Sequence, residues 1–300
     1  MSANADVAKG LTVMYAMDMT TMFPTQLTPP VDGRLAANWQ VVGYLTATDA
    51  ILRGGGGPIS KGDEVCYGVL ARSLADPTQV VATVRGTAGV VEWIEDAQFI
   101  PMNHPNKDCG RVESGFWDIY ASMNFRTSSG GPVTPAAAGI ANAIGPKDTL
   151  TVVGHSLGSA LATYLAFDLA DPARLGTRAS ALLFASPHPG DDTFASAFDQ
   201  RLSGRYTLYN YFLDAVPRVP FGPDYAHLPH VTDLRPSDVE ARIRFDLACS
   251  HHIVCYCSML DYAQTVAVPK IAVDACCVSC VKGPTGVAVT PEATPLVNDR

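Results

Sequence analysis

The stretch from Thr149 to Ala162 places the strongest constraint on how this chain can fold. An apolar, β-branched run leads into Gly154-His155-Ser156-Leu157-Gly158, and leucine and alanine at helical spacing follow. A strand, a sharp turn and a helix around Gly-x-Ser-x-Gly are typical of a nucleophile elbow. The serine at the tip of such a turn has a strained backbone, and only glycine fits two residues to either side. The stretch therefore predicts that Ser156 is a nucleophile presented at the end of a strand.

The order of the predicted elements indicates an α/β fold. Apolar runs bounded by turn residues predict strands, and apolar residues at helical spacing predict helices between them. Alternating strands and helices favour a mostly parallel central sheet with helices on both faces. We expect strands over residues 39–51, 64–72, 79–84, 149–153, 179–185 and 206–213, and helices over 7–23, 113–125, 136–144, 191–202 and from 251 through 256.

Composition and charge limit the domain count and the class of partner. The 300 residues show no break in composition, which predicts a single domain over residues 1–282. Residues 283–300 are rich in proline, threonine and alanine without periodicity, so we expect an extended or mobile tail there. A net charge of −8 disfavours nucleic acid and anionic membrane surfaces as partners. No signal peptide or membrane-spanning segment is recognisable, which is compatible with a cytoplasmic protein or an exported mature chain.

Six of the eight cysteines lie in the last fifth of the chain. Cys255 and Cys257 together with Cys277 and Cys280 have the thiolates for a zinc site, but their spacing matches no finger or ribbon closely. Buried thiols with one or two disulfides are the preferred interpretation. We therefore predict no metal site.

An activated serine needs a histidine as base and a carboxylate that orients the histidine. Where the nucleophile is on an elbow of this kind, the acid follows a later strand and the histidine comes last. Asp214 ends an apolar strand and precedes a proline turn, so it is the predicted acid. Asp191 and Asp192 are the alternatives, but their place at the start of a predicted helix favours N-capping.

Two adjacent histidines, His251 and His252, are the candidate bases. Adjacent side chains cannot both reach one serine, so one of the two is a bystander. The other histidines are excluded by their places in the chain. His104 and His188 precede the acid, His155 belongs to the elbow, and His227 and His230 follow the acid too closely.

Ester hydrolysis also requires donors that stabilise the developing oxyanion, each contributing about 2.7–4 kcal/mol. One donor is the backbone N–H of the residue after the nucleophile, which is Leu157. The second comes from a loop after an earlier strand, and Arg85-Gly86-Thr87 has that place in the sequence. We expect Gly86 to allow close approach and Thr87 to supply its N–H.

Together these motifs resemble the class 3 lipase family, which includes the triacylglycerol lipases of filamentous fungi. The matching segments are Arg85-Gly86-Thr87 with Trp93 and Asp96, Ser114-Gly115-Phe116, Gly154 to Ala162, Phe184-Ala185-Ser186-Pro187 and Asp214 to Pro220. The resemblance covers the chain between about residues 80 and 262. Val84 departs from it, because phenylalanine is usual before the Arg-Gly-Thr pattern. The cysteine-rich end is not a fungal feature, and a bacterial member is the nearer comparison.

The resemblance implies an α/β-hydrolase fold and a Ser156–Asp214–His triad. Family members often carry the catalytic histidine five residues before a tyrosine, with an apolar residue two after the histidine. His251, Ile253 and Tyr256 match this pattern, so His251 is the first choice and His252 the alternative.

The resemblance also implies a lid. Fungal members use the helix after the oxyanion loop for this purpose, and residues 90–97 predict such a helix, although an ordinary core helix fits as well. The apolar residues expected to form a lid are Val90, Val91, Trp93 and Ile94.

We therefore expect a serine esterase or lipase that hydrolyses acylglycerol esters through an acyl-enzyme and meets a lipid–water interface transiently. The chemistry requires no metal or organic cofactor. A phospholipase or short-chain carboxylesterase on the same fold is the nearest alternative. A non-catalytic, lipase-shaped binding module is the alternative from another class, but such a module would be expected to lose part of the triad.

Overall fold

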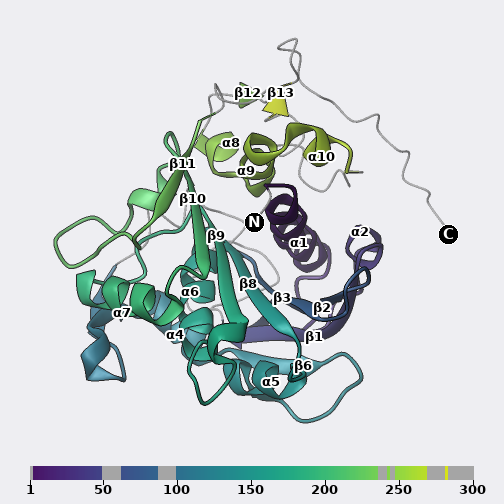
Figure 1. Cartoon of the computed structure of the whole chain (residues 1–300), viewed down its shortest axis with the longest axis horizontal. Coiled ribbons are helices and arrows are strands. Elements are labelled where there is room, and N and C mark those ends of the chain that lie inside the picture. Colours follow the sequence, from purple (N-terminus) through teal and green to yellow (C-terminus); the bar gives the residue numbers. More distant parts are fainter. Residues whose placement is uncertain are drawn as a thin grey trace.

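A computed structural model describes residues 3–48, 62–86, 99–235, 242–243, 247–268 and 281–282 of the chain. Nine strands of these described residues form one central sheet (Figure 1). They are β1 (Trp39–Thr48), β2 (Glu64–Ser73), β3 (Gln79–Val84), β6 (Asn124–Thr127), β7 (Thr134–Pro135), β8 (Thr149–His155), β9 (Ala179–Phe184), β10 (Tyr206–Tyr211) and β11 (Val231–Leu234).

The sheet has a parallel half and an antiparallel half. Its strand order is β11-β10-β9-β8-β3-β2-β1-β6-β7. The neighbours from β11 to β3 run parallel, and those from β3 to β7 run antiparallel. The predicted strands over residues 64–72 and 79–84 correspond to β2 and β3, which pair antiparallel as a hairpin. The elbow follows β8, in the middle of the parallel half, where strands are covered on both faces.

Helices cover both faces of the sheet, as predicted. Alternate residues of β8 enter different cores: Val152 packs with the helices of one face and Val153 with those of the other. One face carries α4 (Ser114–Ala121), α5 (Ala136–Ala143), α6 (Leu157–Leu169) and α7 (Asp192–Leu202). The other face carries α1 (Ala3–Met22) and α9 (Ile253–Leu260).

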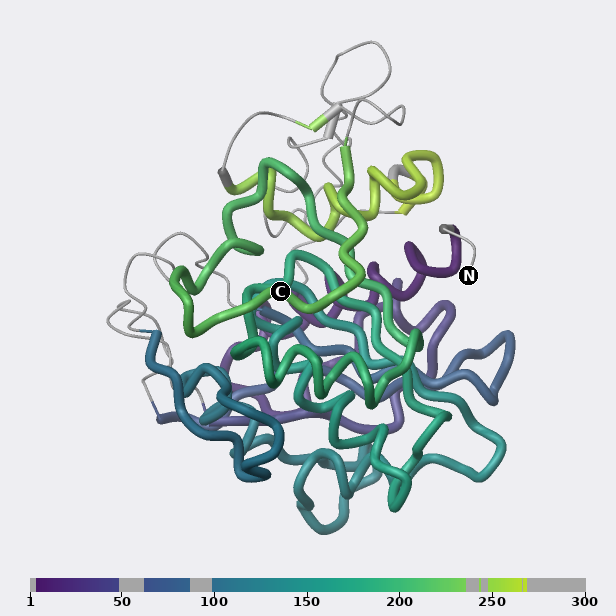
Figure 2. The backbone as a smooth tube through the Cα atoms, turned by 60° about the vertical axis from the view of Figure 1, so that its left-hand side comes forward, coloured from purple at the N-terminus to yellow at the C-terminus, as the bar shows by residue number. Residues whose placement is uncertain are grey.

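Helices far apart in the sequence lie side by side on the second face. Figures 1 and 2 show α1, at the amino-terminal end, next to the group formed by α9 and its neighbours α8 (Leu247–His251) and α10 (Tyr262–Val266). Gly10 of α1 is at this contact, because a Cβ there would lie 3.0 Å from both Cys257 Sγ and Phe184 Cζ. The helix that follows His251, α9, is thus packed against the first helix of the chain. No helix within the described ranges is long and apolar enough to cross a membrane.

The predicted helix over residues 113–125 is wrong at its carboxyl end. α4 ends at Ala121, and Asn124–Thr127 form β6, which pairs antiparallel with β1 between Gly43 and Thr46. Pairing with an open sheet edge satisfies backbone groups of this segment that a last helical turn would leave without partners. The segment before α4 holds a further pair of strands, β4 (Pro101–Asn103) and β5 (Arg111–Glu113), which run antiparallel. The predicted helix over residues 90–97 and the predicted tail over 283–300 lie outside the described residues.

Candidate active site

The turn between β8 and α6 has the strained geometry that the sequence predicts. Ser156 has φ 61° and ψ −136°, a left-handed conformation that costs a non-glycine residue about 1–3 kcal/mol. The two glycines are required by crowding. A Cβ on Gly154 would collide with the carbonyl oxygen of Gly158, and a Cβ on Gly158 would collide with that of Val84. The close approach of α6 to β3 and β8 therefore fixes the position of Ser156.

The side chain of Ser156 is buried, and its hydroxyl makes no hydrogen bond to the described residues. Ser156 is 1% exposed, and its backbone N–H donates to Phe184 O at 3.1 Å. Its Oγ has no hydrogen-bond partner among the described residues and does not cap α6. The elbow is thus held by its backbone while its side chain stays unengaged.

Asp214 lies just beyond β10 and accepts three hydrogen bonds. Val216 N donates to Oδ1 at 2.9 Å, while His251 Nδ1 at 2.8 Å and Tyr256 Oη at 2.7 Å both donate to Oδ2. Asp214 as a whole is 2% exposed. A buried carboxylate with this number of donors is held in one orientation.

The structure brings His251, and not His252, to Asp214. His251 ends α8 and is 6% exposed, with its Nδ1 on the carboxylate and its Nε2 without a partner among the described residues. His252 is the N-cap residue of α9, and its carbonyl accepts from the backbone of Cys255 and Tyr256. Because His251 ends α8 while His252 caps α9, the two adjacent residues have different contacts.

The phenol of Tyr256 is a part of the site that sequence reasoning missed. Tyr256 is fully buried on α9, five residues after His251, and its oxygen also accepts from Tyr211 N at 3.0 Å. Burial first, and then the neighbouring Asp214 charge, raise the pKa of Tyr256 well above its ordinary value, so the phenol remains a donor. The available signal was the tyrosine at this spacing, because a buried phenol needs a polar partner.

The rival residues have structural contacts of their own. Asp191 caps α7 by accepting from Phe194 N at 2.9 Å, as its sequence position predicts. His188 and His227 pack edge to face with ring centroids 4.0 Å apart, and burial and the charge of His227 lower the pKa of His188 to about 4. The remaining alternatives contact protein groups away from the elbow: His104 packs on Trp117, and His230 lies 3.3 Å from Asp199.

Gly86, the residue before Thr87, lies directly against Ser156. A Cβ added to Gly86 would be 2.9 Å from Ser156 Cβ and 3.4 Å from its Oγ, so glycine is needed there. Arg85 anchors this loop by donating through Nε to Cys66 O at 2.9 Å and through Nη1 to Gly86 O at 2.8 Å. Thr87 and the predicted lid residues Val90, Val91, Trp93 and Ile94 lie outside the described residues.

The cysteines of the described chain are mostly buried thiols. Cys66, Cys109, Cys255 and Cys257 form no disulfide, whereas Cys249 is disulfide-bonded. Across the ranges that the structure describes, no group of three or more histidine, cysteine or acidic side chains is placed to hold a metal ion. Cys277 and Cys280, half of the alternative zinc site, lie outside those ranges.

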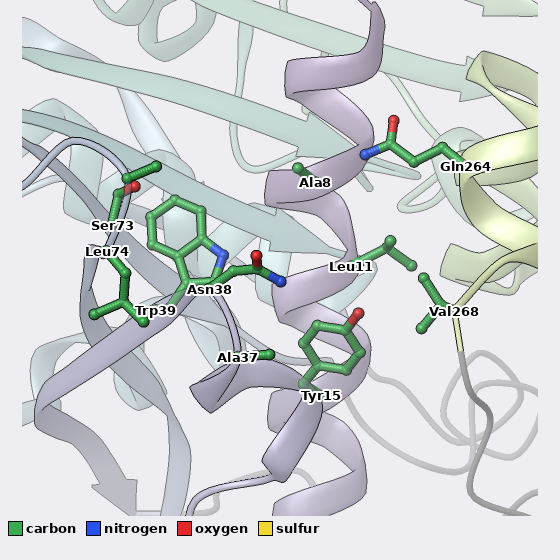
Figure 3. Close-up of a pocket in the computed structure, with 11 residues that line it drawn as sticks. Ala8, Leu11, Tyr15, Ala37, Asn38, Trp39, Ser73, Leu74, Gln264 and Val268 are labelled. Carbon is green, nitrogen blue, oxygen red and sulfur yellow. The ribbon is translucent and has the colours of Figure 1, made fainter.

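A pocket of about 560 Å³ lies away from these residues (Figure 3). Side chains of α1 line it together with Trp39 at the start of β1, the turn after β2 and Gln264 of α10. Because Ser73 ends β2 beside the beginning of β3, the pocket is at the end of the sheet opposite Ser156. None of Ser156, Asp214 and His251 lines it.

Comparisons with known proteins agree with this geometry. Residues 81–223 match the family model described as lipase (class 3). Phospholipase A1-II 6 of Oryza sativa subsp. japonica is 31% identical over 171 residues, which are 49% of this chain and 41% of the rice protein. The lipase of Rhizomucor miehei is 28% identical over 206 residues, 65% of this chain and 53% of that protein. The chain thus spans about half the length of these curated relatives.

The solved structure of the Rhizomucor miehei triacylglyceride lipase superimposes with a TM-score of 0.58 at 18% identity, over 77% of this chain and 80% of that chain. The predicted α/β-hydrolase fold is therefore confirmed. The relatives named here are fungal and plant proteins, and the expected nearness to bacterial members stays a prediction. The elbow, the segment before it and the fold together lead to one assignment: residues 81–223 of the chain match the class 3 lipase family.

Proposed function

We propose that this protein is a serine hydrolase that cleaves carboxylic esters of acylglycerols through an acyl-enzyme. The observation that carries the proposal is the buried hydrogen bond of 2.8 Å between His251 Nδ1 and Asp214 Oδ2 beside the elbow of Ser156. A carboxylate can only accept, so Nδ1 carries the proton and Nε2 of the neutral ring keeps its lone pair. His251 is thereby set up as a base toward the serine hydroxyl.

In the proposed acylation step, Ser156 Oγ bonds to the ester carbonyl carbon while His251 Nε2 takes the hydroxyl proton. The carbonyl electrons move to oxygen, and the tetrahedral oxyanion is stabilised by backbone N–H donors. Collapse of this species breaks the bond to the leaving alkoxide, which receives the proton from His251. Water then repeats the sequence on the acyl-enzyme and releases the carboxylic acid and Ser156.

Two donors are proposed for the oxyanion. Leu157 begins α6, so its N–H points out of the helix N-terminus, where the helix dipole also favours negative charge. Thr87 is the second proposed donor on the basis of its sequence position, supported by the contact of Gly86 with Ser156. Each such donor contributes about 2.7–4 kcal/mol to transition-state stabilisation.

Apolar side chains near the site support an ester with a hydrophobic acyl chain. Phe212 and Leu213 directly precede Asp214 and are 41% and 38% exposed, and Phe221 in the next loop is 75% exposed. These three side chains lie within ten residues of one another in the chain, and large exposed apolar side chains that form one patch mark a surface for an apolar ligand or interface. We propose that this rim meets the lipid–water interface transiently.

A phospholipase A1 activity is the second candidate function, because the relatives include phospholipases A1 from rice and Arabidopsis thaliana. A profile of hydrolysis rates on emulsified triacylglycerol, phosphatidylcholine vesicles and soluble short-chain p-nitrophenyl esters separates lipase, phospholipase and short-chain esterase. We expect triacylglycerol to give the highest rate.

The mechanism itself is tested by labelling with a fluorophosphonate. The folded wild-type protein should form one adduct on Ser156, located by peptide mass spectrometry, and Ser156→Ala should form none. A folded wild-type protein that hydrolyses none of these esters and takes up no label would instead support a non-catalytic binding module.

A further inference from the structure

The elbow contains a second functional group besides the nucleophile, namely the side chain of His155. His155 is the last residue of β8 and is 4% exposed. Its Nε2 lies 2.6 Å from the backbone carbonyl oxygen of His251, and the two rings have centroids 4.6 Å apart. The residue before the nucleophile is therefore bonded to the main chain of the residue that serves as the proposed base.

The chemistry of this contact fixes the tautomer of His155. A carbonyl oxygen only accepts, so Nε2 of His155 must carry a proton and donate it. Burial first, and then the charge of His251, hold the pKa of His155 well below its usual value, so the ring is neutral. The only ring proton of His155 is thus committed to the backbone of His251, and His155 adds no positive charge beside the base.

The segment that carries His251 is short, and the disulfide of Cys249 restrains it two residues before the proposed base. α8 is a helix of five residues, and His251 is its last residue. The next residue is the N-cap of α9, where no side-chain hydrogen bond closes the helix start. The hydrogen bond to Asp214 orients the ring of His251, but it leaves the position of the backbone to other contacts.

We propose that His155 is a positioning residue that holds the backbone of His251 at a fixed distance from Ser156. This inference rests on the proposed function, because it assigns His251 the role of base. His155 is covalently joined to Ser156, so a short hydrogen bond from its ring ties nucleophile and base together through a single side chain. Misplacement of a catalytic group by about 1 Å costs on the order of 100-fold in rate. One hydrogen bond at this point therefore has a measurable effect on turnover.

Matched variants separate the donated hydrogen bond from the volume of the ring. His155→Phe keeps an aromatic ring but has no hydrogen-bond donor. His155→Leu has neither a ring nor a donor, although its volume is close to that of imidazole. His155→Gln keeps an N–H donor at a similar distance from the backbone. We expect His155→Phe and His155→Leu to lower kcat about 10- to 100-fold with little change in KM. His155→Gln should recover most of this loss. Melting temperatures identify any variant that does not fold.

The decisive measurement is a double-mutant cycle with His251→Ala, on p-nitrophenyl acetate as an activated ester. A residue that acts through the base has nothing to position once the base is gone, so His155→Leu should leave the residual rate of His251→Ala unchanged. An equal factor in both backgrounds would overturn the inference, since His155 would then act on Ser156 or on the fold. Equal rates for the wild type, His155→Phe and His155→Leu would also overturn it.

Fluorophosphonate labelling of the same proteins separates this inference from the proposed function. A wild-type protein without label on Ser156 would contradict the proposed function and the inference together. Labelling at the same rate in the wild type and in His155→Leu would contradict the inference alone. We expect slower labelling in His155→Leu and near wild-type labelling in His155→Gln.

Discussion

The nucleophile elbow and the segment that carries His251 are positioned in different ways. Ser156 is held by the residues on either side of it, with β8 before it, α6 after it and glycines where backbones meet. His251 ends one short helix and precedes another. The hydrogen bonds that position it in the site come from residues distant in the sequence, Asp214 and His155. The position of the proposed nucleophile is thus defined by local sequence, whereas that of the proposed base depends on tertiary contacts.

This difference predicts how the two regions respond to mutation. Substitutions in the elbow should act either on the chemistry alone, at Ser156, or on the fold, at its glycines. Substitutions of the residues that contact His251 should each lower the rate only in part, because several separate contacts position His251. Variants that fail to follow this division would contradict it.

The largest effect is expected for Ser156→Ala. Loss of the nucleophile in a serine triad costs about 10⁶-fold in kcat, and the variant should stay folded because the backbone of the elbow is unchanged. Steady-state hydrolysis of p-nitrophenyl esters and the melting temperature measure the two quantities. Ser196→Ala on the exposed face of α7 is the matched control and should keep wild-type activity.

A nearly equal loss is expected for His251→Ala, with little change for its neighbour His252→Ala. Removing the base of a triad costs about as much as removing the nucleophile. His252 has its ring outside the hydrogen bonds to Asp214, so its substitution should alter kcat no more than about 3-fold, a change of under 1 kcal/mol. The reverse order of the two variants would show that His252 is the base.

Gly158→Ala tests whether backbone crowding fixes the position of the elbow. The added Cβ would collide with the carbonyl oxygen of Val84, so we expect a loss of about 1–3 kcal/mol in the free energy of unfolding. Urea denaturation followed by circular dichroism measures it. Gly33→Ala in the short helix α2 (Gly33–Ala36) is the control, since a Cβ there meets no atom within 4 Å. Equal stability of Gly158→Ala and the wild type would contradict the role of crowding.

The parts of the site that could be predicted from the sequence are those with local determinants. The elbow is a contiguous motif, and Asp214 follows an apolar strand at the expected place in the chain order. The choice between His251 and His252 came from a family pattern, because periodicity cannot tell adjacent residues apart. The end of α4 was missed since Asn124–Thr127 take strand geometry only by pairing with β1, a contact distant in sequence.

The contacts of His155 and Tyr256 could not be predicted for a similar reason. Both side chains reach partners that are 96 and 42 residues away in the chain, His251 O and Asp214 Oδ2. A histidine within the elbow looks like part of the motif, and a tyrosine on a helix looks like an ordinary core residue. Their roles depend on how α8 and α9 pack over the end of the sheet, which local sequence does not encode.

A smaller effect on rate than those of Ser156→Ala and His251→Ala is expected for Tyr256→Phe, which removes one of the three donors to Asp214. A hydrogen bond to a charged group contributes about 1.5–3 kcal/mol, so kcat should fall about 10-fold as the carboxylate becomes less well oriented. Tyr262→Phe in α10 removes a phenol that is not among the donors to Asp214 in the described chain and should keep the wild-type rate.

The same variant changes how stability depends on pH. The pKa of Tyr256 is raised in the folded protein, so above pH of about 10 the unfolded phenol loses its proton while the folded phenol keeps it. The folded state then binds more protons, and stability falls as pH rises, with a contribution of about 1.4 kcal/mol per pH unit from one such group. Urea unfolding between pH 9 and 11.5 should give a shallower decline for Tyr256→Phe than for Tyr262→Phe. Equal slopes in the two variants would mean that Tyr256 is not a protonated donor to Asp214, and that the base is positioned by fewer contacts than the structure indicates.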